Sequence, residues 1–293
     1  MDLKNNHYIM PDTLFFQNNI KKRFDNCAQS FSDFDFIHRH CRKDLIGRLA
    51  PIKIAPQQAV DLGSALGSSA IFLEKNYPAC QITNLDISRS MLLSAKNNIK
   101  ALRNINQIQA SAEILPFKND SIDLIFSNLL MPWVNNLSFF LYEINRVLSK
   151  DGLFIFSTLG PDSFANIKAA WSTIDNFEHV NNFIDMHIIG DQLLNSGLFD
   201  PILDSDKLII KYEDVNTFFK DITASGSRNC LRNRNHGLTG KKKFNSFKEY
   251  LEKSKNNNCF NIELELIYGH AWGGTAQTTP NEYSFDVSQI TKR

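Results

Sequence analysis

Residues 60–67 read Val-Asp-Leu-Gly-Ser-Ala-Leu-Gly, an apolar strand that ends in a glycine turn and leads into a helix. A second apolar run ends at Asp86, a little over twenty residues after Gly63. The N–H groups of such a turn and the N-terminus of the helix favour an anionic group. An acid at the end of the next strand accepts hydrogen bonds from ribose hydroxyls. The two runs predict a site for a nucleoside-type cofactor; the alternative is an ordinary turn of a parallel α/β protein.

The spacing of the glycines restricts the kind of cofactor. Gly63 and Gly67 are separated by Ser-Ala-Leu, so the chain lacks the G-x-G-x-x-G fingerprint that binds the pyrophosphate of a dinucleotide. The phosphate-binding loop G-x-x-x-x-G-K-[ST] is absent as well. The sequence therefore supports neither a dinucleotide site nor a P-loop.

Length, composition and charge set further limits. The chain has 293 residues and is 43% hydrophobic, which allows one large α/β domain or two smaller ones, and we expect a single domain over 1–293. A net charge of +1 gives no reason to expect a nucleic-acid or membrane partner. The sequence shows no apolar signal core and no apolar run near the ~18 residues of a membrane span. Five scattered cysteines favour a reducing compartment over disulfides or a zinc site. We expect a cytoplasmic monomer without a metal.

Strand-like and helix-like runs alternate through the first half of the chain. An N-terminal helical segment is predicted over 15–50, followed by a core over 58–160. In that core we predict strands at 58–63, 80–85, 105–109, 122–128 and 152–158, and helices at 67–76, 88–102 and 136–149. This alternation indicates a parallel sheet with helices on both faces. Ligands of such sheets bind beyond the carboxyl ends of the strands.

The second half of the chain is less regular. We predict helices at 162–174, 187–196, 214–224 and 244–256, and strands at 206–212 and 260–268. The segment 214–258 then lies between the last two strands and is too long for a simple loop. We expect it to be a helical lid that selects the substrate.

Three segments resemble the class I S-adenosylmethionine methyltransferases. The pattern from Asp61 to Gly67 is similar to their motif I, usually D-x-G-x-G-x-G, and 111–117 (SAEILPF) is similar to their D-A-E-x-L-P-F segment. Residues 123–128 resemble their fourth strand, and Trp133 beyond it either covers the cofactor or, as we favour, fills the core. The resemblance implies S-adenosylmethionine as cofactor, bound by Phe31, Asp61, Gly63, Ala65, Gly67, Asp86, Ile87, Ser111, Ala112, Glu113 and Ser127.

Later segments resemble one family more closely, the malonyl-acyl carrier protein O-methyltransferases of biotin synthesis. These segments are 154–164 (FIFSTLGPDSF), 237–240 (GLTG) and 268–272 (YGHAW), and the resemblance covers roughly residues 20–273. It implies a three-layer, doubly wound, seven-stranded and mostly parallel sheet. It also implies a substrate with a free carboxylate, either malonyl-acyl carrier protein or malonyl-CoA.

Three departures from the family pattern predict a weakened cofactor site. Ala65 replaces the middle glycine of motif I, which costs about 1 kcal/mol or more if that position needs a positive φ. Ser111 replaces the adenine-binding acid, which removes about another 1 kcal/mol of hydrogen bonding. Phe31 stands where a tyrosine is common. These changes favour one alternative, a non-catalytic binding protein of the same fold. A second alternative is an assembly factor of this fold that modifies a protein arginine, and the segments 237–240 and 268–270 count against it.

The resemblance also suggests how the substrate is held. Arg234 matches an arginine of the family and is our candidate anchor for the malonyl carboxylate, with Asn229 as a second polar contact. The basic run 241–243, with Arg228 and Arg232 upstream, either docks an acidic carrier protein or is a solvated loop. His179 lacks metal-ligand spacing and is expected to be structural.

Overall fold

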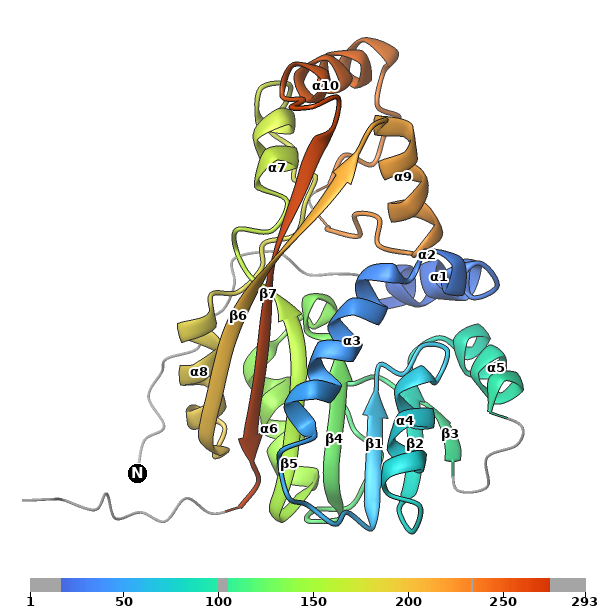
Figure 1. Cartoon of the computed structure of the whole chain (residues 1–293), viewed down its shortest axis with the longest axis vertical. Helices are drawn as coiled ribbons and strands as arrows, with labels where there is room; N and C mark the ends of the chain where they lie inside the picture. The colour runs from blue at the N-terminus through green and yellow to red at the C-terminus, as the bar shows by residue number, and fades with distance from the viewer. Residues whose placement is uncertain (1–16, 100–104, 233, 275–293) are drawn as a thin grey trace, which may run out of the picture.

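The computed structural model describes residues 17–99, 105–232 and 234–274, and its centre is a seven-stranded sheet (Figure 1). The strands are β1 (Gln58–Leu62), β2 (Gln81–Asp86), β3 (Ile105–Gln109), β4 (Ile122–Asn128), β5 (Leu148–Leu159), β6 (Phe199–Tyr212) and β7 (Phe260–Trp272). They lie in the order β3-β2-β1-β4-β5-β7-β6. Strands β1 to β5 pair in parallel, and β7 runs antiparallel to β5 and β6. The predicted seven-stranded, mostly parallel sheet is confirmed.

Helices cover both faces of the sheet and its carboxyl edge. They are α1 (Gln17–Cys27), α2 (Phe31–Phe34), α3 (Phe36–Leu49), α4 (Ser68–Asn76), α5 (Arg89–Asn98), α6 (Leu137–Val147), α7 (Ala165–Ser172), α8 (Met186–Asn195), α9 (Val215–Ala224) and α10 (Lys241–Lys253), with a 3₁₀ turn at Met131–Trp133. Within the described part of the chain, no helix is long and apolar enough to cross a membrane.

Alternating side chains of the strands build two cores, which makes the fold three-layered. On β5, Leu153 and Ile155 pack in the core with α3 and α4, while Phe154 and Phe156 pack with α6 and α8. A side chain of this size that is fully buried contributes about 1.5–3 kcal/mol. The period of two along a strand and the apolar stripes of the helices therefore fix which helix lies on which face.

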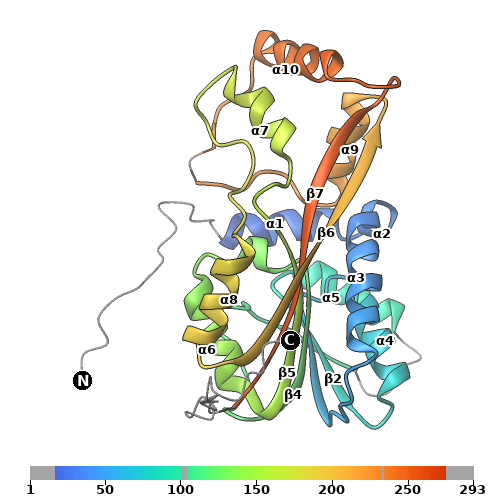
Figure 2. The same ribbon diagram turned by 60° about the vertical axis from the view of Figure 1, so that its left-hand side comes forward.

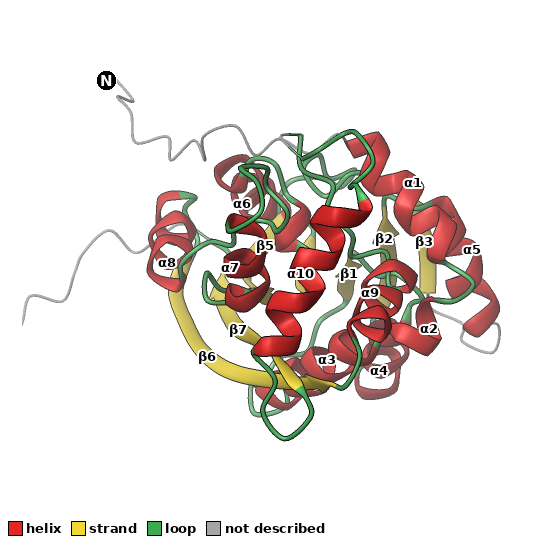
Figure 3. Cartoon of the chain, turned by 90° about the horizontal axis from the view of Figure 1, so that it is seen from above, coloured by secondary structure: helices red, strands yellow, loops and turns green. Residues whose placement is uncertain are grey.

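Strands β6 and β7 project beyond the carboxyl edge of the parallel strands and carry a separate group of helices (Figure 2). Helices α9 and α10 follow β6 and precede β7 in the chain. Seen from above, α10 lies between α7 and α9 (Figure 3). Aromatic contacts hold this group together, since Trp171 of α7 stacks on Phe247 of α10 with 4.5 Å between ring centroids. The arrangement places these helices over the edge at which parallel sheets bind ligands.

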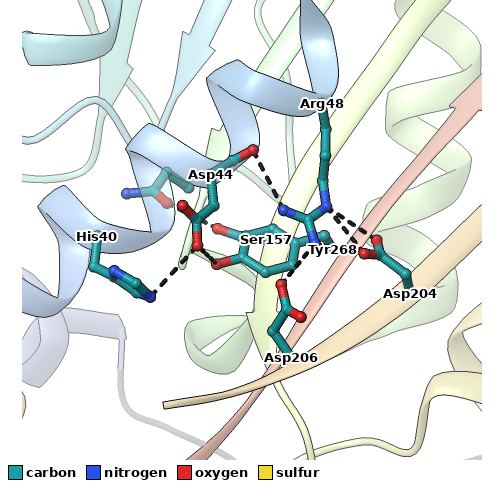
Figure 4. A network of polar contacts seen from close by, with 8 residues as sticks. His40, Asp44, Arg48, Ser157, Asp204, Asp206 and Tyr268 are labelled. Atoms are coloured by element: carbon teal, nitrogen blue, oxygen red, sulfur yellow. Dashed lines mark hydrogen bonds and ion pairs between the residues drawn. The ribbon is translucent and has the colours of Figure 1, made fainter.

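A polar network ties α3 to the outer strands (Figure 4). The guanidinium of Arg48 pairs with Asp204 and, at 2.8 Å, with Asp206. It also lies 3.8 Å from the ring centroid of Tyr268. The Tyr268 hydroxyl donates to Asp44 over 3.2 Å, and burial raises the pKa of Tyr268 above its usual range. The family-like segment 268–272 thus contributes to the fold through Tyr268.

Several boundaries differ from the prediction. Strand β6 begins at Phe199 rather than 206. Its first residues lie on the edge of the sheet, contain Pro201 and three aspartates, and include no fully buried side chain, a pattern typical of a loop. Helix α10 begins at Lys241 rather than 244. Strand β5 begins at Leu148, directly after α6, instead of 152. The predicted ends 15–16 and 100–102 lie outside the described residues.

Candidate active site

A pocket lies at the carboxyl ends of the parallel strands, and α1 contributes to its lining. Eight of the predicted cofactor residues line it: Phe31, Gly63, Ala65, Asp86, Ile87, Ser111, Ala112 and Glu113. Asp61, Gly67 and Ser127 do not line it, and the structure places Asp61 and Ser127 in the buried interior of β1 and β4. The structure therefore brings eight of the predicted residues together around one pocket and places the other three outside its lining.

The turn after β1 forms the floor of this pocket in a left-handed conformation. Gly63, Ala65 and Gly67 have φ of 73°, 44° and 72°. A Cβ on Gly63 would lie 3.0 Å from the Leu130 side chain, and one on Gly67 would lie 2.8 Å from the amide of Asn84. Ala65 therefore occupies a conformation that favours glycine. Because its φ is positive, its methyl group lowers the stability of the turn.

Asp86 closes this turn from the end of β2. One of its carboxylate oxygens accepts the N–H of Ala65 at 2.9 Å, and the other accepts the N–H of Ser88 at 2.8 Å. Burial raises the pKa of Asp86 to about 6, and these backbone hydrogen bonds oppose the rise. Each carboxylate oxygen keeps a further lone pair, so the group can accept ribose hydroxyls as well as holding the turn.

Asp61 supports the turn from behind. Its side chain is 1% exposed, and burial raises its pKa to about 7, while the charge of Arg42 on α3 opposes the rise. Hydrogen bonds from the backbone of Ala70 and the side chain of Ser69 bind it to the first turns of α4. Asp61 is therefore a positioning residue for the strand-to-helix turn.

Helix α1 forms a wall of the pocket that the sequence did not predict. Gln17, Ile20 and Phe24 line the pocket from one face of α1, and Phe24 meets Trp133 edge to face with ring centroids 5.3 Å apart. Trp133 is half-buried and lines the pocket, so the favoured assignment of Trp133 to the core is wrong. Asp25 anchors the helix by accepting the Ser88 hydroxyl at 2.7 Å. The i, i+3, i+7 spacing of 17, 20 and 24 is the sequence signal that was available.

The segment after β3 is bound to α1 and to the loop before α6. The amide of Gln17 donates to the Glu113 carboxylate and, at 3.3 Å, to the Ser111 hydroxyl. Glu113 also accepts the backbone N–H groups of Asn135 and Asn136 at 2.8 and 3.0 Å. Ser111 and Glu113 thus line the pocket, and their hydrogen bonds hold α1 and the loop before α6 in place.

His38 of α3 is a polar residue of the pocket that the sequence analysis missed. Burial lowers its pKa to about 4, so the imidazole is neutral at pH 7. Its Nδ1 is buried and has no hydrogen-bond partner among the described residues. Its backbone carbonyl accepts the amide of Asn128, a second polar lining residue, at 3.0 Å. No motif marks His38, because it lies on a helix remote in sequence from the cofactor segments.

The two residues predicted to hold the substrate lie elsewhere. The Asn229 amide donates to the carbonyl of Glu178 at 2.6 Å and accepts the N–H of Leu231 at 2.8 Å, which commits it to the loop. Arg234 lines a second pocket on the other side of α1. The structure does not bring either side chain into the pocket formed by the glycine turn.

The basic run and His179 meet at one contact between α10 and the segment that follows α7. Lys243 pairs with Asp175 at 2.9 Å, and His179 pairs with the same carboxylate at 2.8 Å. His179 stacks on Trp171 with ring centroids 3.9 Å apart. The structural reading of His179 is confirmed. The basic run 241–243 forms the first turn of α10, so it is not a loop. Its third lysine, Lys243, is paired with Asp175.

The strand order, the glycine turn and the acid at the end of β2 define a class I S-adenosylmethionine-dependent methyltransferase. A family model described as a methyltransferase domain matches residues 60–156. The structure of the YcgJ protein from Bacillus subtilis shares this fold, with a TM-score of 0.58 and 18% identity over 78% of this chain and 97% of that chain.

Curated relatives narrow the class to one family. The chain is 33% identical to the malonyl-[acyl-carrier protein] O-methyltransferase of Legionella pneumophila, over 94% of this chain and 98% of that protein. It is 34% identical to the protein of the same name from Gallionella capsiferriformans, over 86% of this chain and 89% of that protein. The chain belongs to the malonyl-[acyl-carrier protein] O-methyltransferase family.

The residues of the pocket fit the cofactor of this class. The left-handed turn at Gly63 brings backbone close to a ligand, Asp86 offers acceptors for two hydroxyls, and Ile87 and Ala112 give apolar contact for a base. S-adenosylmethionine is therefore the cofactor, and the protein is an enzyme of the methyltransferase class.

Proposed function

We propose that this enzyme methylates the free carboxylate of malonyl-acyl carrier protein, or of malonyl-CoA, as an early step of biotin synthesis. The observation that carries the proposal is the pocket between the glycine turn and α1, in a chain similar over 94% of its length to a malonyl-[acyl-carrier protein] O-methyltransferase. We further propose that it acts in the cytoplasm as a monomer, and that 214–258 is the substrate lid.

The roles of the pocket residues follow from their positions. Asp86 would hold the ribose, Ile87 and Ala112 the adenine ring, and the turn at Gly63 the amino-acid portion of the cofactor. When bound, S-adenosylmethionine supplies an electrophilic methyl group. A carboxylic acid with a pKa of about 4 is already ionised at pH 7, so the chain needs no general base. Its residues act by positioning the carboxylate and excluding water.

We propose His38 in place of Arg234 as the contact for the reacting carboxylate. His38 lines the pocket and is neutral, so it can donate one hydrogen bond without pairing the negative charge of the nucleophile. A guanidinium would bind both oxygens and reduce their reactivity. His38 is thus a group that orients the substrate and leaves one oxygen to react.

Turnover on matched substrates tests this function. Malonyl-acyl carrier protein should accept a methyl group, whereas acetyl-acyl carrier protein, which has the same carrier and lacks the carboxylate, should not. His38→Ala should slow turnover by tenfold or more with little change in cofactor affinity. Equal methylation of both substrates would show that the carboxylate is not the acceptor.

A non-catalytic binding protein is the second candidate. The strained φ of Ala65, the serine at 111 and the phenylalanine at 31 favour it, because each removes a contribution to cofactor binding. Calorimetric titration with S-adenosylmethionine separates the candidates when combined with the turnover assay. Cofactor binding without turnover on any malonyl thioester would support the second candidate. The family assignment counts against the arginine-modifying alternative.

A further inference from the structure

Helix α1 separates the cofactor pocket from a second pocket. Its residues 17, 20 and 24 face the cofactor pocket, whereas Asn19, Lys22, Arg23 and Asn26 line the second. Both sets follow helical spacing, so they occupy different faces of one helix. The opposite wall comes from the segment after α9, which includes Gly226, Arg228 and Arg234.

The second pocket is built by close packing of this segment against α1. Gly226 has a φ of 74°, and a Cβ there would lie 2.8 Å from the Cys27 sulfur at the end of α1. The guanidinium of Arg23 donates to the backbone carbonyl of Asn229 at 2.7 Å. The Ser30 hydroxyl contacts the carbonyl of Ala224 at 3.5 Å. These contacts join α1 to the segment between α9 and α10 and fix the shape of the pocket.

The lining of this pocket is strongly cationic. Lys22, Arg23, Arg228 and Arg234 line it, and no acidic residue does. Within residues 17–99, 105–232 and 234–274, none of these four pairs with a carboxylate. Burial lowers the pKa of Arg23, and the charges of Arg228 and Arg234 lower it further. The four cations repel one another, so an anion would stabilise the arrangement.

The geometry points to a site for a phosphate ester. A guanidinium group can donate two parallel hydrogen bonds to two oxygens of a phosphate. Arg23 and Arg234 each donate one hydrogen bond to a backbone carbonyl, which leaves their other N–H groups for a ligand. The inference rests on the proposed function, because a malonyl thioester is carried on a pantetheine arm that ends in a phosphate ester. The phosphate would lie on one side of α1 and the reacting carboxylate on the other, separated by about the 10 Å diameter of a helix.

This site gives Arg234 a role different from the one expected. Arg234 would hold the phosphate of the arm rather than the carboxylate, together with Arg23 from α1. Lys22 and Arg228 line the same pocket and are exposed, so their charges would attract the phosphate itself and also the acidic carrier. A carrier-protein phosphodiester and the phosphates of CoA share the chemistry that the site recognises.

A series of malonyl thioesters tests the phosphate site. Malonyl-pantetheine lacks phosphate, malonyl-phosphopantetheine adds it, and malonyl-CoA and malonyl-acyl carrier protein present it from the two sources. For the unmodified enzyme, malonyl-phosphopantetheine should have a KM at least tenfold lower than malonyl-pantetheine. Equal KM values for these two substrates would overturn the inference. A larger gain for the carrier protein than for CoA would identify the carrier as the source.

The double substitution Lys22→Gln with Arg228→Gln assigns the effect to this pocket. Both side chains are exposed, so the fold should tolerate the change. KM should rise about tenfold for the phosphorylated substrates and stay unchanged for malonyl-pantetheine. The control is Lys53→Gln with Lys118→Gln, which removes the same charge from exposed residues that do not line either pocket.

Two results would contradict the assignment. An equal loss on malonyl-pantetheine would show a structural role, and an equal loss in the control would show a general charge effect. If no substrate is turned over, the proposed function fails, but the phosphate site can still be tested. Calorimetry then compares the affinity of the protein for phosphopantetheine with its affinity for pantetheine. Tighter binding of phosphopantetheine that is lost only in the pocket variant would support the site, and equal binding would exclude it.

Discussion

At the scale of single residues, two buried carboxyl groups dominate the chemistry of the cofactor site. Asp86 lines the pocket and holds the Ala65 N–H, while Asp61 lies behind the turn and binds the start of α4. The sequence predicted both acids from their spacing to Gly63 and Gly67. It could not separate the contacting acid from the supporting one, because that depends on how α3 and α4 pack around Asp61 and leave Asp86 at the pocket.

The raised pKa of Asp86 predicts that cofactor affinity depends on pH. Only the ionised carboxylate can accept two hydroxyls, so affinity should rise with pH up to about 6 and fall about tenfold per pH unit below it. Calorimetric titration with S-adenosylmethionine between pH 5 and 7.5 measures this dependence. Asp86→Asn should weaken binding by about 1–3 kcal/mol at pH 7 and remove the slope.

Asp123 provides the matched control for Asp86. Its carboxylate likewise accepts two backbone N–H groups, from Gln57 and Gln58, but it lies at the start of β4, far from the carboxyl edge. Asp123→Asn should keep the pH slope of cofactor binding. A slope that persists in Asp86→Asn would mean that another group controls the affinity.

Relief of the strained turn is a second prediction at this scale. Ala65→Gly should raise the free energy of unfolding by up to about 1 kcal/mol, because the gain at positive φ exceeds the added freedom of the unfolded chain. Ala112→Gly, in the same pocket and without a positive φ, should be neutral or destabilising. Denaturant unfolding of both variants measures the difference. If Ala65→Gly is destabilised as much as Ala112→Gly, the turn carries no strain.

At the scale of elements, helix α1 and the region between β6 and β7 determine what the enzyme can bind. The sequence predicted helices at 15–50 and 214–258 from apolar spacing, and the structure contains α1 to α3 and α9 to α10 there. It could not predict that α1 lies between two pockets, because that contact joins residues some two hundred positions apart. The first residues of β6 were missed because Pro201 and three aspartates between 199 and 206 are typical of a loop.

The three lysines at the start of α10 should have two different functions. Lys241 and Lys242 are exposed, whereas Lys243 pairs with Asp175. Replacing Lys241 and Lys242 with Ala should raise the KM for malonyl-acyl carrier protein, more at low salt than at high salt, and leave malonyl-CoA unchanged. Lys243→Ala should instead lower stability by at most about 1 kcal/mol, because the pair is partly exposed. An equal rise of KM for both substrates would exclude this face as a carrier dock.

At the scale of the whole molecule, the buried acids predict how stability depends on pH. The folded-state pKa values of Asp61 and Asp86, about 7 and about 6, lie above the ordinary value of 3.8. Between pH 4 and 7 these two acids bind more protons in the folded protein than in the unfolded chain, so their contribution to the free energy of unfolding falls as pH rises. His38, whose pKa burial lowers to about 4, contributes with the opposite sign below its ordinary value of 6.5. Thermal or denaturant unfolding without cofactor, compared between the natural chain and a variant of either acid, should show this contribution.

Asp61→Asn isolates the contribution of the more deeply buried acid. It should reduce the loss of stability between pH 5 and 8 by on the order of 3 kcal/mol, and Asp123→Asn should leave that loss unchanged. A variant with the same pH dependence as the natural chain would show that Asp61 ionises normally in the folded state.

The most direct test of the whole account is the fate of a labelled methyl group. We expect the enzyme to transfer it from S-adenosylmethionine to malonyl-acyl carrier protein as a methyl ester, so that mild alkali releases the label as volatile methanol. Asp86→Asn should reduce the rate at limiting cofactor. Label that stays bound to the protein after alkali, as an N- or C-methyl group would, or an absence of transfer despite cofactor binding, would contradict carboxylate methylation.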